Sequence, residues 1–523
     1  MANGVLKMAA GNFLRVEVPM GKVFGFAARQ PRKWIILISV IFVAAAASAA
    51  VLPRLMVFLD RTGLMGSYSG TGPANTSNPF FQPLGTNGRT CATCHVASDA
   101  FGLSAQHAQQ VFAATSGSDP LFAEVDGANC PGLPRNEASS HSMLINNGLL
   151  RITLQVPINA QFQIRAVHDP YGCAVTTDPV SGQETISVYR RPLPSTNLTY
   201  LSAVMDDGRE TVAPLDNPAT YAANLETDLR HQALDAVMGH AQASVTPTDA
   251  QLAAIVRFES GLYSAQALDN RAGLLNAGGA DGGPVKLSQQ TYYPGINDVL
   301  GQDPKGLAFS PDVFTLFASW DSGRESERPG VQARQAIAGG EAIFNTRPLT
   351  IANVPGLNDN PAVATALRTN LPVPPFQGTC STCHDAPNVG DHSTAVPLDV
   401  GTSHDPAEER NVLVANALSQ VSSPDMPVYE ITGCPNPFPD PQDPRASYVL
   451  YTTDPGRALI TGQCKDLNRI KGPILRGLAA RAPYFHNGAA RNLMEVVNFY
   501  NERFQMNLTD EEKSDLIAFL NSL

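Results

Sequence analysis

The chain has 523 residues, which at about 150 residues per domain allows roughly two to four domains. Hydrophobic residues make up 43% of the chain and charged residues 16%, a balance that excludes wholesale disorder. The formal net charge of −11 argues against nucleic-acid binding through a basic face. An acidic body suits a basic partner protein, although solubility alone also explains it.

The N-terminal segment has the opposite charge. Residues 1–33 contain six Lys and Arg residues and a single acidic residue, Glu17. Residues 34–49 then carry no charge and end in the sequence ASA, which is typical of a secretory signal with its cleavage site. The alternative is an uncleaved anchor, because the uncharged run through residue 52 is just long enough to span a bilayer. We therefore expect an exported, periplasmic-type protein that meets a membrane only through residues 1–49, if at all.

Two pentapeptides of the form C-x-x-C-H carry the clearest chemical signal: residues 91–95 (CATCH) and 380–384 (CSTCH). This is the attachment pattern of c-type haem. The two thiols can add to the vinyl groups of one porphyrin, and the adjacent His supplies the proximal iron ligand. A zinc ribbon would need its Cys pairs about 15–20 residues apart, and a thioredoxin-like motif needs no His after the second Cys.

We therefore expect two covalently attached c-type haems. The first is held by Cys91, Cys94 and His95, and the second by Cys380, Cys383 and His384, with the two histidines as iron ligands.

The four remaining cysteines favour disulfides, which an exported protein can form. One pair follows each haem motif, so Cys130–Cys173 and Cys434–Cys464 are the natural pairing. The sequence leaves the other two pairings open, and also metal binding by these cysteines.

The predicted elements indicate two haem-bearing halves. A helical segment at residues 332–343 leads to the second motif, and residues 78–81 lead to the first. Residues 492–503 place apolar side chains at helical spacing, and the capping box at residues 509–512 (TDEE) opens a closing helix. A short helix, a loop and then C-x-x-C-H is how a cytochrome c domain begins.

Between the motifs the pattern is mixed. Alternating or β-branched runs at residues 152–156, 162–167 and 184–189 predict a small sheet, and residues 220–269 predict a return to helix. The expected fold class is mainly α, with two cytochrome c-like haem domains and a small β-containing insertion in the first half. The expected domains are residues 50–328, the N-terminal haem domain with its insertion, and residues 329–523, the C-terminal haem domain.

The sequence resembles the bacterial di-haem cytochrome c peroxidases and their MauG-type relatives. Besides the two haem motifs, four segments are similar to family signatures: residues 190–195 (RRPLPS), 207–210 (DGRE), 471–477 (KGPILRG) and 482–488 (APYFHNG). The resemblance implies that hydrogen peroxide or dioxygen reacts at the N-terminal haem. It also implies that the C-terminal haem passes electrons from a small redox-protein donor or an oxidisable substrate.

The resemblance further implies a Met or Tyr as second axial ligand of the C-terminal haem. Tyr500 occupies that position, as in the MauG-type branch, and a phenolate would favour ferric iron and lower its potential relative to Met. Alternatively, Tyr500 is an aromatic of the core and Met494 or Met426 is the ligand. His486 is expected to be structural or to contact a haem propionate.

The chain departs from the family at the N-terminal haem. Val204 stands where the family has a Gln before F-W-D-G-R, His231 replaces a Glu before Gln-Ala, and the tryptophan between the haems has no counterpart. His231 has three interpretations: a base that moves the first proton of bound peroxide to the leaving oxygen, an iron ligand, or a surface histidine. Arg209 is expected to steady a peroxide or a propionate, or to form a buried salt bridge. These two are the candidate catalytic residues.

These observations predict an exported di-haem c-type cytochrome that acts as a peroxidase-like oxidoreductase. Two alternatives stand beside it: an electron carrier in which both irons are six-coordinate, and MauG-like oxidation of a protein or organic substrate. A calcium ion is a further cofactor candidate.

Overall fold

The structure is a computed structural model that describes residues 51–212, 221–321, 327–393, 396–439 and 448–523. The predicted signal or anchor segment therefore lies outside the described residues. Among the helices that the structure describes, none is long and apolar enough to cross a membrane.

Helices hold 31% of the described residues and strands 15%, so helix exceeds strand and several small sheets accompany the helices. The predicted cytochrome c-like character of the two haem domains stays a prediction. The α-helices are α1 (Cys91–Cys94), α2 (Ala105–Thr115), α3 (Ser142–Asn147), α4 (Tyr221–Gly239), α5 (Asp249–Ser260), α6 (Pro284–Leu287), α7 (Pro329–Thr346), α8 (Pro361–Ala366), α9 (Val412–Leu418), α10 (Ala458–Thr461), α11 (Leu493–Arg503) and α12 (Asp510–Asn521). The strands are β1 (Leu55–Leu59), β2 (Gly63–Ser69), β3 (Leu150–Gln155), β4 (Gln163–His168), β5 (Val175–Thr177), β6 (Glu184–Arg190), β7 (Leu262–Asp269), β8 (Gly273–Leu274), β9 (Leu349–Ile351), β10 (Phe376–Gly378), β11 (Val428–Thr432) and β12 (Leu450–Thr452).

The two C-x-x-C-H motifs are built in the same way. Each begins a short helical turn, α1 in the first half and the 3-10 helix η8 (Cys380–Thr382) in the second, and a threonine before each turn forms a capping box. The ring centroid of Phe80 lies 6.4 Å from that of His95, and the centroid of Phe344 lies 6.1 Å from that of His384. The fold therefore presents the two motifs against equivalent aromatic supports.

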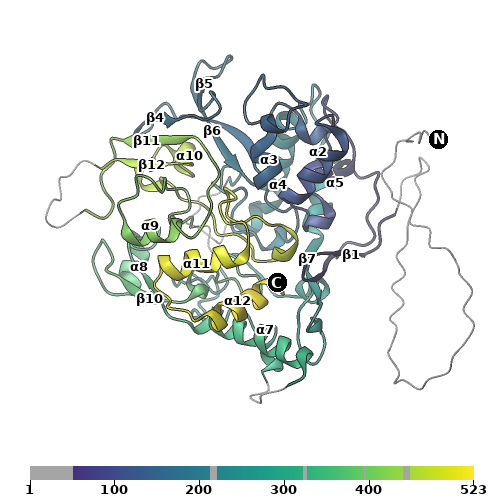
Figure 1. The fold of residues 1–523 in the computed structure, drawn as a ribbon, viewed down its shortest axis with the longest axis vertical. Helices are drawn as coiled ribbons and strands as arrows, with labels where there is room; N and C mark the ends of the chain where they lie inside the picture. The colour runs from purple at the N-terminus through teal and green to yellow at the C-terminus, as the bar shows by residue number, and fades with distance from the viewer. Residues whose placement is uncertain (1–50, 213–220, 322–326, 394–395, 440–447) are drawn as a thin grey trace, which may run out of the picture.

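A later helix closes over each motif. Phe258 of α5 contacts Phe80 at a centroid distance of 4.8 Å, and Phe519 of α12 contacts Phe344 at 5.7 Å. Helix α12 packs along α7 at Gly340, where an added Cβ would lie 2.0 Å from a carbonyl oxygen of α12. A residue without a Cβ is needed for this close approach. Figure 1 shows α2–α5 grouped on one side of the molecule and α7, α11 and α12 together in another part.

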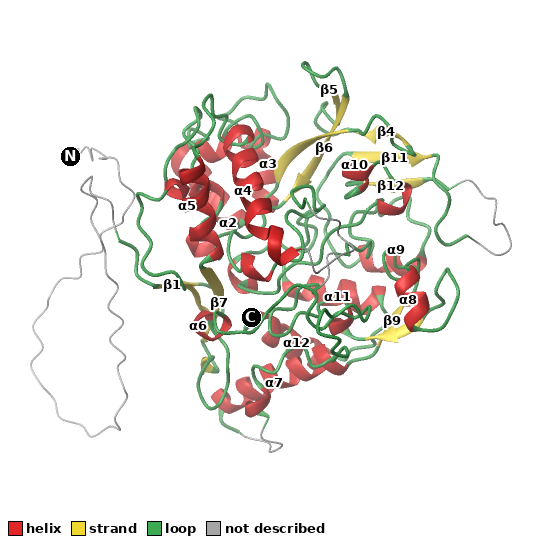
Figure 2. Ribbon diagram, turned by 180° about the vertical axis from the view of Figure 1, so that it is seen from behind, coloured by secondary structure: helices red, strands yellow, loops and turns green. Residues whose placement is uncertain are grey.

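The three predicted strands of the insertion are present as β3, β4 and β6, but they do not form one sheet. Strand β6 pairs with β3 and β5, whereas β4 pairs with β11 of the second half, which also pairs with β12. Figure 2 shows β4, β11 and β12 side by side near α10. A separate hydrophobic core, which includes Ile186, Val188, Tyr429 and Ile431, joins these strands. The halves thus share a sheet across the predicted boundary at residues 328–329, and that boundary stays a prediction.

The helical prediction for residues 220–269 is correct for α4 and α5 but wrong for the last segment, which forms strand β7. This strand lies between β2 and β8 in the sheet of order β1-β2-β7-β8. Its polar residues Ser264 and Gln266 are buried against β2. Because β2 precedes β7 by some two hundred residues, the local pattern could not reveal this pairing.

Both predicted disulfides are present, Cys130–Cys173 and Cys434–Cys464. The four cysteines of the haem motifs remain free thiols.

A buried ion network joins the two halves. Arg190, at the end of β6, is fully buried between Asp207 of the first half and Asp454 of the second. Its Nε donates to Asp454 Oδ2 at 2.6 Å, and Nη2 donates to Oδ1 at 2.9 Å. Burial opposes ionisation of Asp207, but Arg190 and Arg209 hold the pKa of that carboxyl well below its usual range. The three groups are therefore charged at neutral pH.

We expect Arg190→Met to lower the free energy of unfolding by about 3–5 kcal/mol, because it leaves two buried carboxylates without their cation. Urea unfolding at pH 7 measures the change. The control is Arg165→Met, whose guanidinium is 66% exposed in its pair with Glu430. There we expect a loss of at most about 1 kcal/mol.

Equal losses in the two variants would contradict the role given to this network. The sign of the pH dependence follows from the depressed pKa of Asp207. The contribution of the network is complete above the ordinary carboxyl pKa and declines as the pH falls below about 4 towards the folded-state value.

Candidate functional site

Each C-x-x-C-H motif lines one cavity, and both cavities have mostly apolar walls. Cavity 1 measures about 190 Å³ and cavity 2 about 220 Å³. The motif side chains at their walls are Cys91, Cys94 and His95 in cavity 1, and Cys380, Cys383 and His384 in cavity 2.

The two motif histidines are held as neutral imidazoles. His95 Nδ1 lies 3.1 Å from the carbonyl oxygen of Phe101, and His384 Nδ1 lies 2.5 Å from that of Gly390. Burial lowers the pKa of each imidazole to about 4. A neutral ring whose Nδ1–H donates to a carbonyl keeps the Nε2 lone pair for a metal ion.

The motif cysteines are half-buried, and their thiols have raised pKa values. Burial raises the pKa of Cys94 to about 11 and that of Cys380 to about 12. Redox-active thiols of the thioredoxin kind have lowered pKa values. The raised pKa values of these cysteines therefore argue against a thioredoxin-like redox role.

The two cavities adjoin. The segments that line both of them are residues 191–194, Asp206, Lys471, Pro473 and Arg481. Groups bound in the two cavities would thus be separated by a wall made of these shared residues. None of the shared residues is aromatic.

This wall and its surroundings contain cations without acidic partners. Arg191, Arg476 and Arg481 each have a buried Nε atom without an acceptor, and none of them forms an ion pair with a described residue. Burial lowers the pKa of Arg191 and Arg481 to about 10 and that of Arg476 to about 9. Buried guanidinium groups without anions are costly. A ligand that brings carboxylates would complete them, and haem carries two propionates, so the residues present fit a haem in each cavity.

Tyr500 lies at cavity 2, and its role as an iron ligand stays a prediction. Its hydroxyl has no hydrogen-bond partner among the described residues. Burial raises the pKa of this phenol. The two predicted alternatives lie elsewhere, because Met494 is 41% exposed and Met426 is buried in a cluster outside the cavity. Met506 does line cavity 2 and was missed by the sequence reasoning.

Two further histidines line cavity 2. His486 lies between Ser403, whose Oγ is 3.2 Å from Nε2, and Asp454, whose Oδ2 is 3.7 Å away. His392 was missed; it is buried, and its ring centroid lies 6.4 Å from that of His384. Its distance of eight residues from His384 matches no ligand spacing, so the sequence carries no signal for it.

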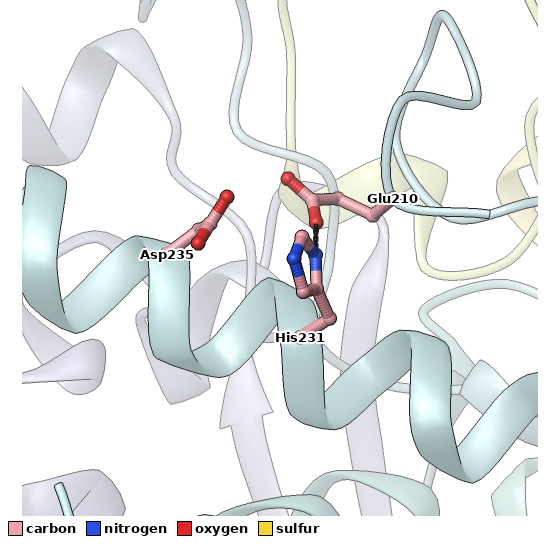
Figure 3. Close-up of side chains that lie close together, drawn as sticks. All are labelled: Glu210, His231 and Asp235. Atoms are coloured by element: carbon pink, nitrogen blue, oxygen red, sulfur yellow. Dashed lines mark hydrogen bonds and ion pairs between the residues drawn. The ribbon is translucent and has the colours of Figure 1, made fainter. Parts of the chain in front are cut away.

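The structure does not bring His231 into cavity 1. Helix α4 presents Leu229 and Gln232 to the cavity, whereas the side chain of His231 is 54% exposed. Its Nδ1 lies 2.6 Å from Oε2 of the buried Glu210, and Asp235 points towards the same place from the next turn of α4 (Figure 3). The hydrogen bond that His231 donates to the Glu210 carboxylate raises the pKa of His231. This placement favours the surface interpretation, and a role of His231 in proton transfer stays a prediction.

Arg209 does line cavity 1. It also donates to Asp207 Oδ2 at 3.0 Å, so the predicted salt bridge is present, and a role in steadying a peroxide or a propionate stays a prediction. Val204 lines the same cavity, as its position in the motif predicts. Glu259 of α5 also lines cavity 1 and was missed. The sequence feature that could have identified Glu259 is an acidic residue on the apolar face of a helix.

Comparisons with known proteins fit this geometry. No family model matches the chain. The cytochrome-c peroxidase IdrP2 of Denitromonas iodatirespirans is 31% identical over 157 residues, which are 28% of this chain and 36% of that protein. The cytochrome-c peroxidase IdrP2 of Pseudomonas sp. (strain SCT) is 26% identical over 227 residues, 41% of this chain and 53% of that protein. The matches thus span about a third to a half of these relatives.

Among solved structures, a MauG-like protein associated with microbial copper homeostasis is 13% identical, with a TM-score of 0.31 over 85% of this chain and 87% of that one. The curated relatives are named cytochrome-c peroxidases, which agrees with the predicted resemblance to the cytochrome c peroxidase family.

We expect Glu210→Gln to lower the pKa of His231 towards that of a free imidazole, because the carboxylate stabilises the imidazolium. NMR titration of the histidine ring signals measures the change. Asp425→Asn, which removes the partner of His168 instead, is the control and leaves the pKa of His231 unchanged. A pKa of His231 that is the same in the Glu210→Gln variant and the parent would contradict the pairing.

Proposed function

We propose that this protein is an exported di-haem c-type cytochrome that acts as a peroxidase-like oxidoreductase. Hydrogen peroxide reacts in cavity 1 and electrons enter through cavity 2. The observation that carries the proposal is the pair of adjoining cavities, each with two free thiols and a neutral histidine, surrounded by buried arginines that lack acids. The curated cytochrome-c peroxidases support the reaction class.

The attachment residues follow from the motifs. Cys91 and Cys94 would bind one haem and Cys380 and Cys383 the other, with His95 and His384 as iron ligands. When bound, the haems supply iron centres that exchange electrons with peroxide and with each other.

The chain itself supplies binding, exclusion of water and charge. Leu229, Ala233 and Val237 of α4 close cavity 1 with an apolar wall that keeps out bulk water. Arg209 offers a guanidinium at the same wall, where it steadies an anionic peroxide or a propionate. Arg191 and Arg481 hold carboxylates at the wall that both cavities share.

The two cavities differ in the side chains that line them, and this difference supports different roles for the two haems. Tyr500 faces cavity 2 with a free hydroxyl and would close that iron as a second ligand, which suits electron transfer. Cavity 1 has no described tyrosine at its wall. The acidic body of the chain favours a basic redox protein as the electron donor.

We expect His95→Ala to abolish reaction with peroxide, because the N-terminal iron loses the ligand that positions it, while the His384 haem remains reducible. Peroxide consumption and dithionite titration of the purified holoprotein measure the two properties. The matched variant His384→Ala should impair reduction by the donor protein first. Loss of both functions in His95→Ala would contradict the division of labour.

We expect Tyr500→Phe to change the low-spin ferric spectrum of the C-terminal haem, because Phe cannot donate an oxygen ligand. Electron paramagnetic resonance of the ferric protein measures the ligand field. Tyr484→Phe is the control, since Tyr484 lines the same cavity but its hydroxyl donates to the carbonyl oxygen of Leu478. A spectrum unaltered by Tyr500→Phe would make Tyr500 a residue of the core.

A further inference from the structure

Glu259 is a buried acid at the wall of cavity 1. It lies in the last turn of α5, is 5% exposed, and lines the cavity together with Ile255. Among the described residues, no hydrogen bond or ion pair engages its carboxyl group. Buried carboxyl groups are normally paired, so an unpaired one that opens onto a cofactor cavity needs an explanation.

The other half of the molecule shows that packing does not require an acid here. Helix α12 occupies the corresponding place at cavity 2, and its Phe519 supports Phe344 as Phe258 supports Phe80. The residue that follows Phe519 is Leu520, which lines cavity 2 as Glu259 lines cavity 1. An apolar side chain is therefore compatible with this position in the fold, and packing does not explain the acid in cavity 1.

The surroundings of Glu259 contain no charge that fixes its ionisation. Burial alone raises the pKa of Glu259 to about 8. Of the elements packed against α5, η1 (Pro79–Phe81) has no titratable side chain, and η5 (Leu198–Tyr200) has Tyr200, whose hydroxyl donates to a backbone carbonyl. Helix α4 packs there with Gln232 facing the cavity, while its His231 and Asp235 are exposed.

Most charged groups elsewhere on the cavity 1 wall are engaged with one another or belong to the cations described above. The exception is Asp206, whose pKa burial raises although Arg190 and Lys471 oppose this. Arg89 and His240 both pair with Asp126, and Arg209 pairs with Asp207. On the nearest element, Glu259 acts on Cys91, whose thiol pKa it helps to raise after the larger effect of burial. Glu259 is therefore close to the place where a haem edge would be attached, and its charge responds to the charge of the group bound there.

We infer that Glu259 is the proton-exchanging group of cavity 1: it takes up one proton from solvent when one electron is added to a haem held by Cys91, Cys94 and His95. When the electron leaves, Glu259 releases the proton, so charge in the apolar cavity stays balanced. The bond that forms and breaks is the O–H bond of the carboxyl group. The electron comes from a redox-protein donor or a chemical mediator. This inference rests on the proposed haem in cavity 1, but not on its reaction with peroxide.

Spectroelectrochemistry of the holoprotein between pH 6 and pH 9 tests the inference. In the parent protein, the midpoint potential of the N-terminal haem should fall with rising pH, with a limiting slope of about 59 mV for each tenfold change in proton concentration. Glu259→Gln should remove this slope, and Glu259→Asp should restore part of it. The C-terminal haem, which has Leu520 at the equivalent position, is the internal control and keeps its own pH dependence in all variants.

Glu341→Gln is the matched control variant. Glu341 is also buried, and burial raises its pKa to about 7 although backbone N–H groups oppose this. Unlike Glu259, it accepts hydrogen bonds from the N–H groups of Leu316 and Phe317, and it lines neither cavity. The slope at the N-terminal haem should be unchanged in this variant. Equal slopes in the parent and in Glu259→Gln, or a pH-independent potential in the parent, would overturn the inference.

A second measurement covers the case in which Glu259→Gln does not fold. Redox-difference infrared spectra of the parent holoprotein should show a protonated carboxyl band that appears on reduction of the N-terminal haem and shifts in D₂O. Its absence would overturn the inference. Mass spectrometry of the same sample separates the two proposals, because a peptide with Cys91 and Cys94 that carries no haem would contradict the proposed function instead.

Discussion

The buried guanidinium of Arg190 joins the two halves of this protein. It is fully buried and lies between Asp207, which follows β6 in the first half, and Asp454, which follows β12 in the second. Burying three charges is favourable only when they satisfy one another, so these segments must meet in one arrangement. The sheet that β4 shares with β11, and the cavities on either side of the wall at residues 191–194, depend on that arrangement.

The same network extends to both cavities. Arg209 at cavity 1 pairs with Asp207, and the imidazole of His486 at cavity 2 lies 3.7 Å from Asp454, so a continuous series of polar contacts passes through Arg190. Arg191, Arg476 and Arg481, whose buried Nε atoms lack acceptors, line the cavities, whereas the other cavity walls are mostly apolar. The fold thus combines a rigid, fully compensated ionic centre with cationic edges that a carboxylate-bearing cofactor would complete.

The sequence predicted the parts that depend on local chemistry. The haem motifs, the capped closing helix at Thr509, both disulfides and the cavity position of Tyr500 all follow from spacing or from motif resemblance. The partners of strands β4 and β7 did not, because each pairs with a segment far away in the chain. His231 shows the same limit, since its motif position is near cavity 1 while the rotation of α4 turns Gln232 inward. The sequence did not indicate that Glu259, on the apolar face of α5, lines cavity 1.

The central claim is that cavity 1 is a peroxide site that works with an electron-transfer site in cavity 2. The most direct test is stopped-flow absorption spectroscopy of the one-electron-reduced holoprotein mixed with one equivalent of hydrogen peroxide. We expect peroxide to be consumed within the rapid phase and spectral changes to occur at both haems. Two low-spin spectra that do not change, with the peroxide intact, would contradict it and show an electron carrier.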